Sequence, residues 1–204
     1  MRTKALLAAA AFAAGLAASM AQNVYSLNVV GYYNITIPPN SFALIANQLN
    51  TTNNTLNNIL PSVPDFTPLW KFSNGSYVPS TFLGEGIGWD PDLTLNPGEG
   101  AFIKNVTDSP MTITFVGEVL QGSLTNQLPA GFSIVSSMVP VAGTLNDLGV
   151  PGDDFDQAYK FASGSWTTSI YVEGWLDAFS VDVGEAFFLK RQQAGEWVRE
   201  FTVE

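Results

Sequence analysis

Residues 55–77 read TLNNILPSVPDFTPLWKFSNGSY, and residues 144–166 read TLNDLGVPGDDFDQAYKFASGSW. Aligned without a gap, 89 positions apart, the two stretches are identical at nine of 23 positions. Composition alone would give roughly one or two matches. A second block, Gly88–Lys104, recurs 86 positions later as Gly174–Lys190 with six further identities. The sequence therefore predicts two tandem copies of one module of about 90 residues.

Each copy has the pattern of short strands joined by tight turns. Large side chains alternate with a lysine in Trp70–Phe72 and in Tyr159–Phe161, which places the aromatic rings of each strand on one face. Asn74-Gly75 and Ser163-Gly164 are typical of β-hairpin turns. We expect the matching aromatic residues to be buried in the core of each copy; these are Trp70 and Tyr159, Phe72 and Phe161, and Phe102 and Phe188.

A single helical turn is expected near the start of each repeat, at Thr55–Ile59 and Thr144–Leu148, with the threonine as its cap. No long amphipathic helix is indicated elsewhere. The predicted fold is all-β, with two tandem small antiparallel β-sandwich or barrel-like modules, each with one short helical turn. We place copy one at residues 22–116, with an extra N-terminal strand, and copy two at residues 117–204. A continuous strand through Val116-Gly117 is expected to join them.

The N-terminus has the pattern of a signal peptide. Arg2 and Lys4 precede an Ala- and Leu-rich apolar run, and small residues at Ser19 and Ala21 suit cleavage before Gln22. The sequence therefore predicts a signal peptide at residues 1–21 and an exported protein that is periplasmic, cell-surface or extracellular. Removing Arg2 and Lys4 from a chain of net charge −10 leaves −12, a balance that disfavours nucleic acid and anionic membranes. No membrane span is expected after signal cleavage.

The repeated pattern resembles that of uncharacterised exported bacterial tandem β-repeat proteins. The shared motifs are Phe42–Ile45, the aromatic-Lys-Phe strand Trp70–Phe72, the Asn-Gly-x-Tyr turn Asn74–Tyr77 and the Pro-Gly-x-Gly turn Pro97–Gly100. Copy two departs from the last motif at Val183 and Ala186. The resemblance implies an accessory β unit of surface and secreted proteins and carries no catalytic residues over.

Histidine and cysteine are both absent, which excludes His-based triads, Cys nucleophiles and His/Cys zinc sites. Carboxylate chemistry stays possible, because a glycosidase needs two facing carboxyl groups. The candidates by residue type are Glu85, Asp90, Glu99, Glu173 and Glu185. Glu99 and Glu185 recur in both copies, and an enzyme rarely duplicates its catalytic acid, so a structural role is favoured, as acceptors for turn N–H groups or as partners of a nearby lysine.

The only cofactor that the sequence suggests is calcium. Asp153, Asp154 and Asp156 lie together in a turn, and carboxylate oxygens are ligands that Ca²⁺ takes. Asp90 and Asp92 form a thinner cluster. Neither cluster has EF-hand spacing, and the alternative is a solvated acidic loop.

Trp89 and Trp175 each follow a glycine in a loop and are candidates for glycan binding by ring stacking, if they are exposed. The alternative is that both rings belong to the core. The N-terminal segment Val24–Val30 is a candidate for strand-mediated self-association, the alternative being that it completes the sheet of copy one.

These observations favour a non-enzymatic exported structural or interaction protein of the cell envelope or extracellular space, with glycan or other envelope proteins as partners. A carbohydrate-binding module is the second hypothesis, and a carboxylate-dependent glycoside hydrolase is the third.

Overall fold

The computed structural model describes residues 29–203. Nearly all of their regular structure is β-strand, paired antiparallel, so the prediction of an all-β fold is confirmed. In this part of the chain, no helix has the length and apolar character needed to cross a membrane. The predicted signal peptide, residues 1–21, lies outside the described residues.

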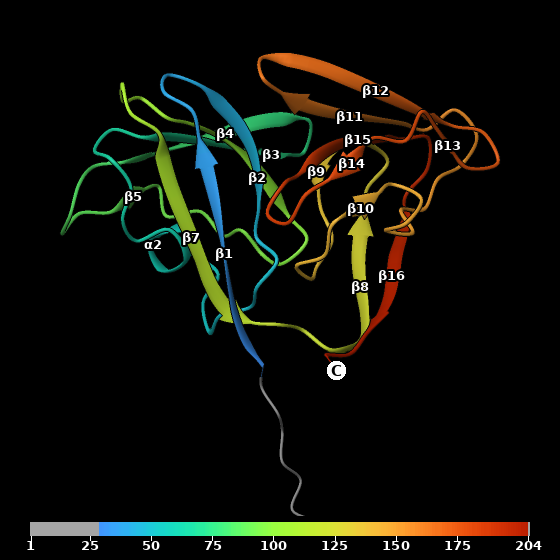
Figure 1. Ribbon diagram of the computed structural model, residues 1–204, viewed down its shortest axis with the longest axis horizontal. Helices are drawn as coiled ribbons and strands as arrows, with labels where there is room; N and C mark the ends of the chain where they lie inside the picture. The colour runs from blue at the N-terminus through green and yellow to red at the C-terminus, as the bar shows by residue number, and fades with distance from the viewer. Residues whose placement is uncertain (1–28, 204) are drawn as a thin grey trace, which may run out of the picture.

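The N-terminal half of the structure, β1 to β7, contains two sheets (Figure 1). The first and last strands pair as a two-stranded ribbon, β1–β7. The others form a five-stranded sheet in the order β2-β6-β3-β4-β5. The elements are β1 (Val30–Ile37), β2 (Phe42–Ala46), α2 (Leu56–Ile59), β3 (Pro68–Ser73), β4 (Ser76–Phe82), β5 (Trp89–Asp90), β6 (Gly100–Lys104) and β7 (Met111–Glu118).

The C-terminal half, β8 to β16, repeats this arrangement. Its first and last strands pair as the ribbon β8–β16, and its five-stranded sheet has the order β9-β15-β11-β12-β13. A short pair, β10–β14, is added. The elements are β8 (Gly122–Leu128), β9 (Gly131–Val135), β10 (Gly143–Thr144), β11 (Gln157–Ala162), β12 (Ser165–Tyr171), β13 (Trp175–Leu176), β14 (Ser180–Val181), β15 (Phe187–Arg191) and β16 (Gly195–Phe201). The domain boundaries drawn from the sequence stay a prediction.

The core of each half lies between its ribbon and the inner face of its five-stranded sheet. In β7, Met111, Ile113 and Phe115 are buried and alternate with exposed residues, as expected of a strand with one covered face. Phe115 stacks on Tyr33 of β1, with ring centroids 5.1 Å apart. The Tyr33 hydroxyl donates to the Ala46 carbonyl oxygen and accepts from the Gln48 N–H. Burial raises the pKa of Tyr33 well above its ordinary value, so the phenol stays a donor.

Of the two predicted helical turns, one is a helix. Leu56–Ile59 forms α2, in which the Ile59 N–H bonds to the Thr55 carbonyl. The matching Leu148 N–H bonds to the Thr144 carbonyl, but that segment is a hydrogen-bonded turn rather than a helix. Thr55 makes no side-chain cap, which corrects that expectation, whereas the Thr144 hydroxyl accepts from the Asp147 N–H at 3.2 Å.

Each half begins with its own strand, β1 in one and β8 in the other. The extra N-terminal strand was expected at Val24–Val30, whereas β1 spans Val30–Ile37, and β8 was not predicted. Both closing strands pair with these opening strands, β7 with β1 and β16 with β8. The expectation of one continuous strand joining the copies is therefore wrong, because β7 ends at Glu118 and β8 begins at Gly122. Of the Val24–Val30 segment, residues 24–28 lie outside the described residues. Val30 opens β1 opposite Glu118, and self-association through this segment stays a prediction.

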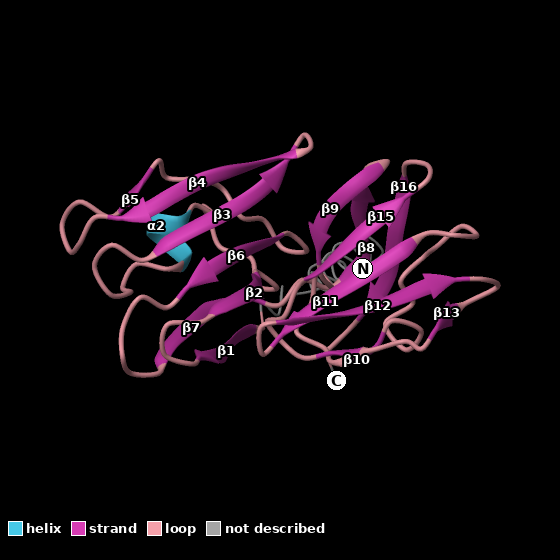
Figure 2. Cartoon of the chain, turned by 90° about the horizontal axis from the view of Figure 1, so that it is seen from above, coloured by secondary structure: helices cyan, strands magenta, loops and turns pink. Residues whose placement is uncertain are grey.

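The two halves meet through reciprocal contacts. The Ala46 N–H donates to the Gly184 carbonyl at 2.8 Å, and the Ser136 N–H donates to the Gly98 carbonyl at 2.9 Å. Ala46 is the last residue of β2 and Ser136 directly follows β9. The two residues occupy the same place in the aligned sequences of the halves, and so do the two glycines. The junction therefore has an approximate two-fold symmetry, and Figure 2 shows the two five-stranded sheets side by side across it.

The turns that carry Gly98 and Gly184 have the same backbone conformation. Their φ angles are +91° and +82°, although copy two lacks the proline of the motif. A Cβ on Gly184 would lie 2.8 Å from side-chain atoms of both Tyr33 and Ile35 in the other half. Glycine is therefore required there both by conformation and by the close approach of the two halves.

Candidate functional site

Trp89 and Trp175 are core residues, which corrects the hypothesis that they bind glycan. Each is only 3% exposed. Their indole N–H groups donate to the carbonyls of Leu60 and Val150, at 2.8 and 2.9 Å. With both ring faces covered by protein, neither residue can stack on a sugar ring from solvent.

A repeated asparagine fixes the backbone of each tryptophan. The backbone N–H of Trp89 donates to the side-chain oxygen of Asn57, and that of Trp175 donates to Asn146. Both asparagines are identities within the repeated stretch quoted above. The sequence therefore held a signal for the structural role of this pair, because the asparagine and the tryptophan are both conserved between the two copies.

The geometry does not support the calcium hypothesis for Asp153, Asp154 and Asp156, because Arg191 forms ion pairs with Asp153 and Asp156. The Asp156 side chain is fully buried and accepts from Arg191 Nε at 3.1 Å and from the Gln192 N–H at 2.7 Å. Arg191 Nη2 lies 2.8 Å from Asp153 Oδ2. Within the described part of the chain, Asp154 accepts only from the Glu173 N–H, at 3.4 Å. No group of three potential metal-ligating side chains occurs within residues 29–203.

The solvated-loop alternative is wrong for Asp156, which forms a buried ion pair. The residues at these places in the N-terminal half are Thr67 and Asn105, both buried and neutral. The sequence could have suggested the pair, since an acid and a base appear together at two positions where the first copy has neither.

Glu99 and Glu185 are held in place by the turns that contain them. Lys71 Nζ lies 2.9 Å from Glu99, and Lys160 Nζ lies 2.6 Å from Glu185. The same carboxylates accept from the N–H groups of Asn96 and Asp182. Both glutamates therefore have the structural environment weighed as the alternative to catalysis. They line two different hollows, so the structure does not bring them together as a catalytic pair.

The remaining carboxylate candidates, Glu85, Asp90 and Glu173, are exposed. Asp90 lies in β5, whereas Glu85 and Glu173 lie in turns that lead to β5 and β13. None of the three lines the hollows described below.

The aromatic residues expected in the core lie instead on the outer faces of the five-stranded sheets, where the two halves meet. Of the six, only Phe188 is buried; Trp70, Phe72, Phe102, Tyr159 and Phe161 are half-buried. Period-2 alternation is obeyed, but the inner face belongs to the other residues, such as Leu69, Ile103 and Leu189. The prediction that these rings fill the core of each half is therefore wrong, because they lie on the outer face of each sheet and not on the inner face.

The rings cross the junction in matching pairs. Phe72 packs edge-on against Phe188, and Phe161 packs edge-on against Phe102, each with centroids 5.6 Å apart. Phe102 and Phe188 themselves lie 6.0 Å apart, at the centre. These contacts stabilise the junction and extend an aromatic surface over both sheets.

This surface, the aromatic face, has two shallow hollows related by the junction symmetry. The first has a volume of about 390 Å³ and the second about 540 Å³. Four rings of the face are close to half exposed: Phe42 by 44%, Tyr77 by 48%, Phe132 by 46% and Trp166 by 50%. Lys104 and Lys190 lie over Phe42 and Phe132, 5.4 and 5.5 Å from the ring centroids. The first hollow is lined by Phe42, Trp70, Tyr77, Phe102 and Phe161, and the second by Phe72, Tyr77, Phe132, Tyr159, Trp166, Thr168 and Phe188.

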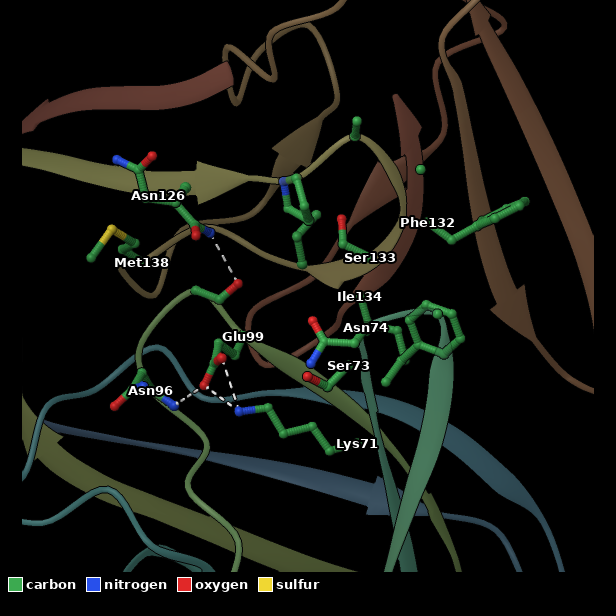
Figure 3. A pocket seen from close by; sticks show the side chains of 18 of the residues that line it. Lys71, Ser73, Asn74, Asn96, Glu99, Asn126, Phe132, Ser133, Ile134 and Met138 are labelled. Atoms are coloured by element: carbon green, nitrogen blue, oxygen red, sulfur yellow. Dashed lines mark hydrogen bonds and ion pairs between the residues drawn. The ribbon is translucent and has the colours of Figure 1, made fainter. Parts of the chain in front are cut away.

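A third hollow, the polar pocket, adjoins the aromatic face between the two halves (Figure 3). Its volume is about 660 Å³. The β3–β4 hairpin contributes Ser73 and Asn74, and the turn before β6 contributes Asn96 and Glu99. Strand β9 and the loop before it form the facing wall, with Phe132 and Ser133.

The sequence interpretation missed the polar pocket, because it took Asn74 only as a turn residue and did not consider Asn96. The available signal was a departure from the repeat. Copy two has Ser163 and Asp182 at these two places.

No family model matches the chain, and neither the curated proteins nor the solved structures contain a match. The resemblance to exported bacterial β-repeat proteins stays an expectation from the sequence.

Proposed function

We propose that this protein is a non-enzymatic, exported interaction protein that binds another protein through its aromatic face. The observation that carries the proposal is the set of half-exposed rings, Phe42, Tyr77, Phe132 and Trp166, on one continuous surface. Contiguous apolar surface of this kind marks interaction sites in soluble proteins, and aromatic residues are enriched at the centres of protein interfaces.

The energetics of such a contact are sufficient for binding. Covering a half-exposed ring removes on the order of 100 Å² from water, which stabilises a complex by about 2.5 kcal/mol. Each of these rings also packs against a neighbouring ring of its own half, so little side-chain freedom is lost on binding. Four such rings on a prearranged surface would act together as the centre of an interface.

A non-enzymatic role is supported by the side chains available. The chain has no histidine or cysteine, and the two recurrent glutamates are engaged by lysines and turn N–H groups. Export is supported by the pattern of the first 21 residues, from Arg2 to Ala21.

The experiment compares the chain from Gln22 with a Tyr77→Ser/Trp166→Ser variant and a Tyr32→Ser control. Tyr32 is 74% exposed but lies on β1, away from the face. Each form is immobilised and exposed to the proteins of the source cell's envelope, and each retained protein is purified and its Kd measured by interferometry. We expect a partner whose Kd rises at least tenfold for the double variant and changes less than twofold for Tyr32→Ser.

The proposal fails if no protein is retained specifically, or if the two variants bind equally well. Retention of another copy of this chain alone would show that the face is a surface for self-association. Thermal unfolding of both variants establishes that a loss of binding is not a loss of fold.

A further inference from the structure

The polar pocket combines neutral hydrogen-bonding groups with aromatic walls. The side chains of Ser73, Asn74 and Asn96 make no hydrogen bond to other described residues, so their groups are free for a ligand. Figure 3 shows Ser73 and Asn74 on one side of the opening, and Asn96 and Glu99 on another. Carboxamides and hydroxyls that both donate and accept suit a ligand rich in hydroxyl groups.

Ser133 adds a polar group that makes no hydrogen bond within the fold. It lines the pocket from β9, and its hydroxyl oxygen is buried without a hydrogen-bond partner. The matching residue of the other half is Ala43, so the backbone accepts alanine at this place. A buried polar group without a partner is costly and suggests a role outside the fold.

The pocket presents no unbalanced charge. Among the described residues that line the pocket, Lys71 is the only cation, and its ammonium group donates to Glu99 and to the Thr94 carbonyl. Glu99 in turn accepts from Lys71 and from the Asn96 N–H. A neutral ligand is therefore favoured over an anion or a cation.

Phe72 and Phe132 line the same pocket, and Phe132 is 46% exposed. Aromatic rings offer apolar faces, and a sugar ring has C–H groups that pack on such a face while its hydroxyls reach amides. The volume of about 660 Å³ lies within the range of small-molecule sites, ~300–1,000 Å³.

The structure assigns the polar pocket as a binding site for a neutral saccharide. One site per chain is expected, because the matching hollow is smaller, about 440 Å³, and has no amide at the places of Asn74 and Asn96. The amide that lines it, Asn40, donates to Asp108. There Ala43, Ala162 and Ser163 stand where the polar pocket has Ser133, Ser73 and Asn74. The pocket shares Phe72 and Phe132 with the second hollow of the aromatic face, but its polar groups line neither hollow, so this inference does not depend on the proposed protein partner.

The test titrates the chain from Gln22 with neutral oligosaccharides, two to four units of glucose, mannose, galactose or N-acetylglucosamine, by calorimetry and saturation-transfer NMR. We expect one site for at least one series. Asn74→Ala and Ser133→Ala should each raise the Kd at least fivefold. The matched control Ser163→Ala, at the place of Asn74 in the other hollow, should change it less than twofold.

Three results would overturn the assignment. They are no binding of any series at millimolar concentration, equal loss with Ser163→Ala, and preference for uronic acid oligomers over neutral ones. Tyr77→Ser/Trp166→Ser should leave the affinity unchanged. If only that double variant loses affinity, the sugar binds on the aromatic face. That result would contradict the assignment of the polar pocket as the sugar site.

Discussion

The polar pocket and its counterpart are built on the same frame but lined by different side chains. In both, the turn of the Gly-Glu motif faces the start of β2 or β9, and a lysine holds the glutamate, Lys71 with Glu99 and Lys160 with Glu185. What the two hollows share is therefore structural. The two hollows differ at three places, where the polar pocket has an amide and two hydroxyls and its counterpart has a serine and two alanines. We expect a ligand to be recognised at these places.

A second difference between the halves lies under the sheets. The C-terminal half has the buried pair Asp156–Arg191 where the N-terminal half has Thr67 and Asn105. Asn105 donates to the carbonyls of Ile37 and Ser109, so the neutral version fixes its loops by hydrogen bonds alone. One backbone frame therefore accepts either solution, provided that each buried polar group has a partner.

The largest effect is expected from breaking the buried pair. Asp156→Ala leaves Arg191 buried without its main partner, which should lower the free energy of unfolding by about 3–5 kcal/mol. Thr67→Ala, at the matching place, removes the bond to the Pro64 carbonyl and one buried methyl group, together worth about 2 kcal/mol. Urea unfolding of both variants measures the difference, and equal losses would show that the pair is not the stabilising element described here.

The junction should be sensitive to a single methyl group. Gly184→Ala forces alanine to φ +82° and a clash with Tyr33 and Ile35, with an expected cost of about 1–3 kcal/mol for the backbone and more for the clash. Gly164→Ala is the control, since that residue has φ +76° with no atom within 4 Å of the new Cβ. The excess cost of Gly184→Ala over Gly164→Ala reports the contact between the halves, and no excess would mean that they do not pack as described.

A smaller effect of opposite sign is expected at two exposed phenylalanines. Phe66 and Phe155 have φ angles of +62° and +72° and are 69% and 70% exposed. Glycine relieves the strained backbone and loses little packing, so Phe66→Gly and Phe155→Gly should each raise stability by up to about 1 kcal/mol. Thermal unfolding that shows a clear loss for either variant would indicate that the ring packs against the fold.

The smallest effect on stability is expected at acidic pH. Hydrogen bonds from the Thr144 side chain and N–H lower the pKa of Asp147 below its ordinary value. Because the folded-state pKa is depressed, the stabilisation is present above the unfolded-state pKa, near 4, and is lost as the pH falls through the folded-state value. Asp147→Asn should therefore flatten the loss of stability below about pH 4. Asn58, the matching residue, is already neutral, and an unchanged pH profile in Asp147→Asn would contradict this assignment.

The sequence was sufficient for the all-β class and for the hairpins, since Asn74-Gly75 joins β3 to β4 and Ser163-Gly164 joins β11 to β12. It was not sufficient for the face of each strand. Both faces of β3 carry large side chains, so alternation placed Trp70 and Phe72 together without indicating whether they pack inside one half or between two.

The sites were less predictable because they depend on contacts between distant residues. Arg191 and Asp156 are 35 positions apart, and the polar pocket combines the hairpin at residue 74 with strand β9. The sequence marked these places only as departures from the repeat, and the physical meaning of a departure depends on the residue that faces it.

The most direct test replaces the polar pocket's distinctive side chains by those of its counterpart. In Ser73→Ala/Asn74→Ser/Ser133→Ala, every new residue already occupies the matching place in the other hollow, so stability should change by less than about 1 kcal/mol. Calorimetry with the best-bound neutral oligosaccharide should then show at least a tenfold rise in Kd. Unchanged affinity in a stable triple variant would contradict the claim that recognition resides where the two hollows differ.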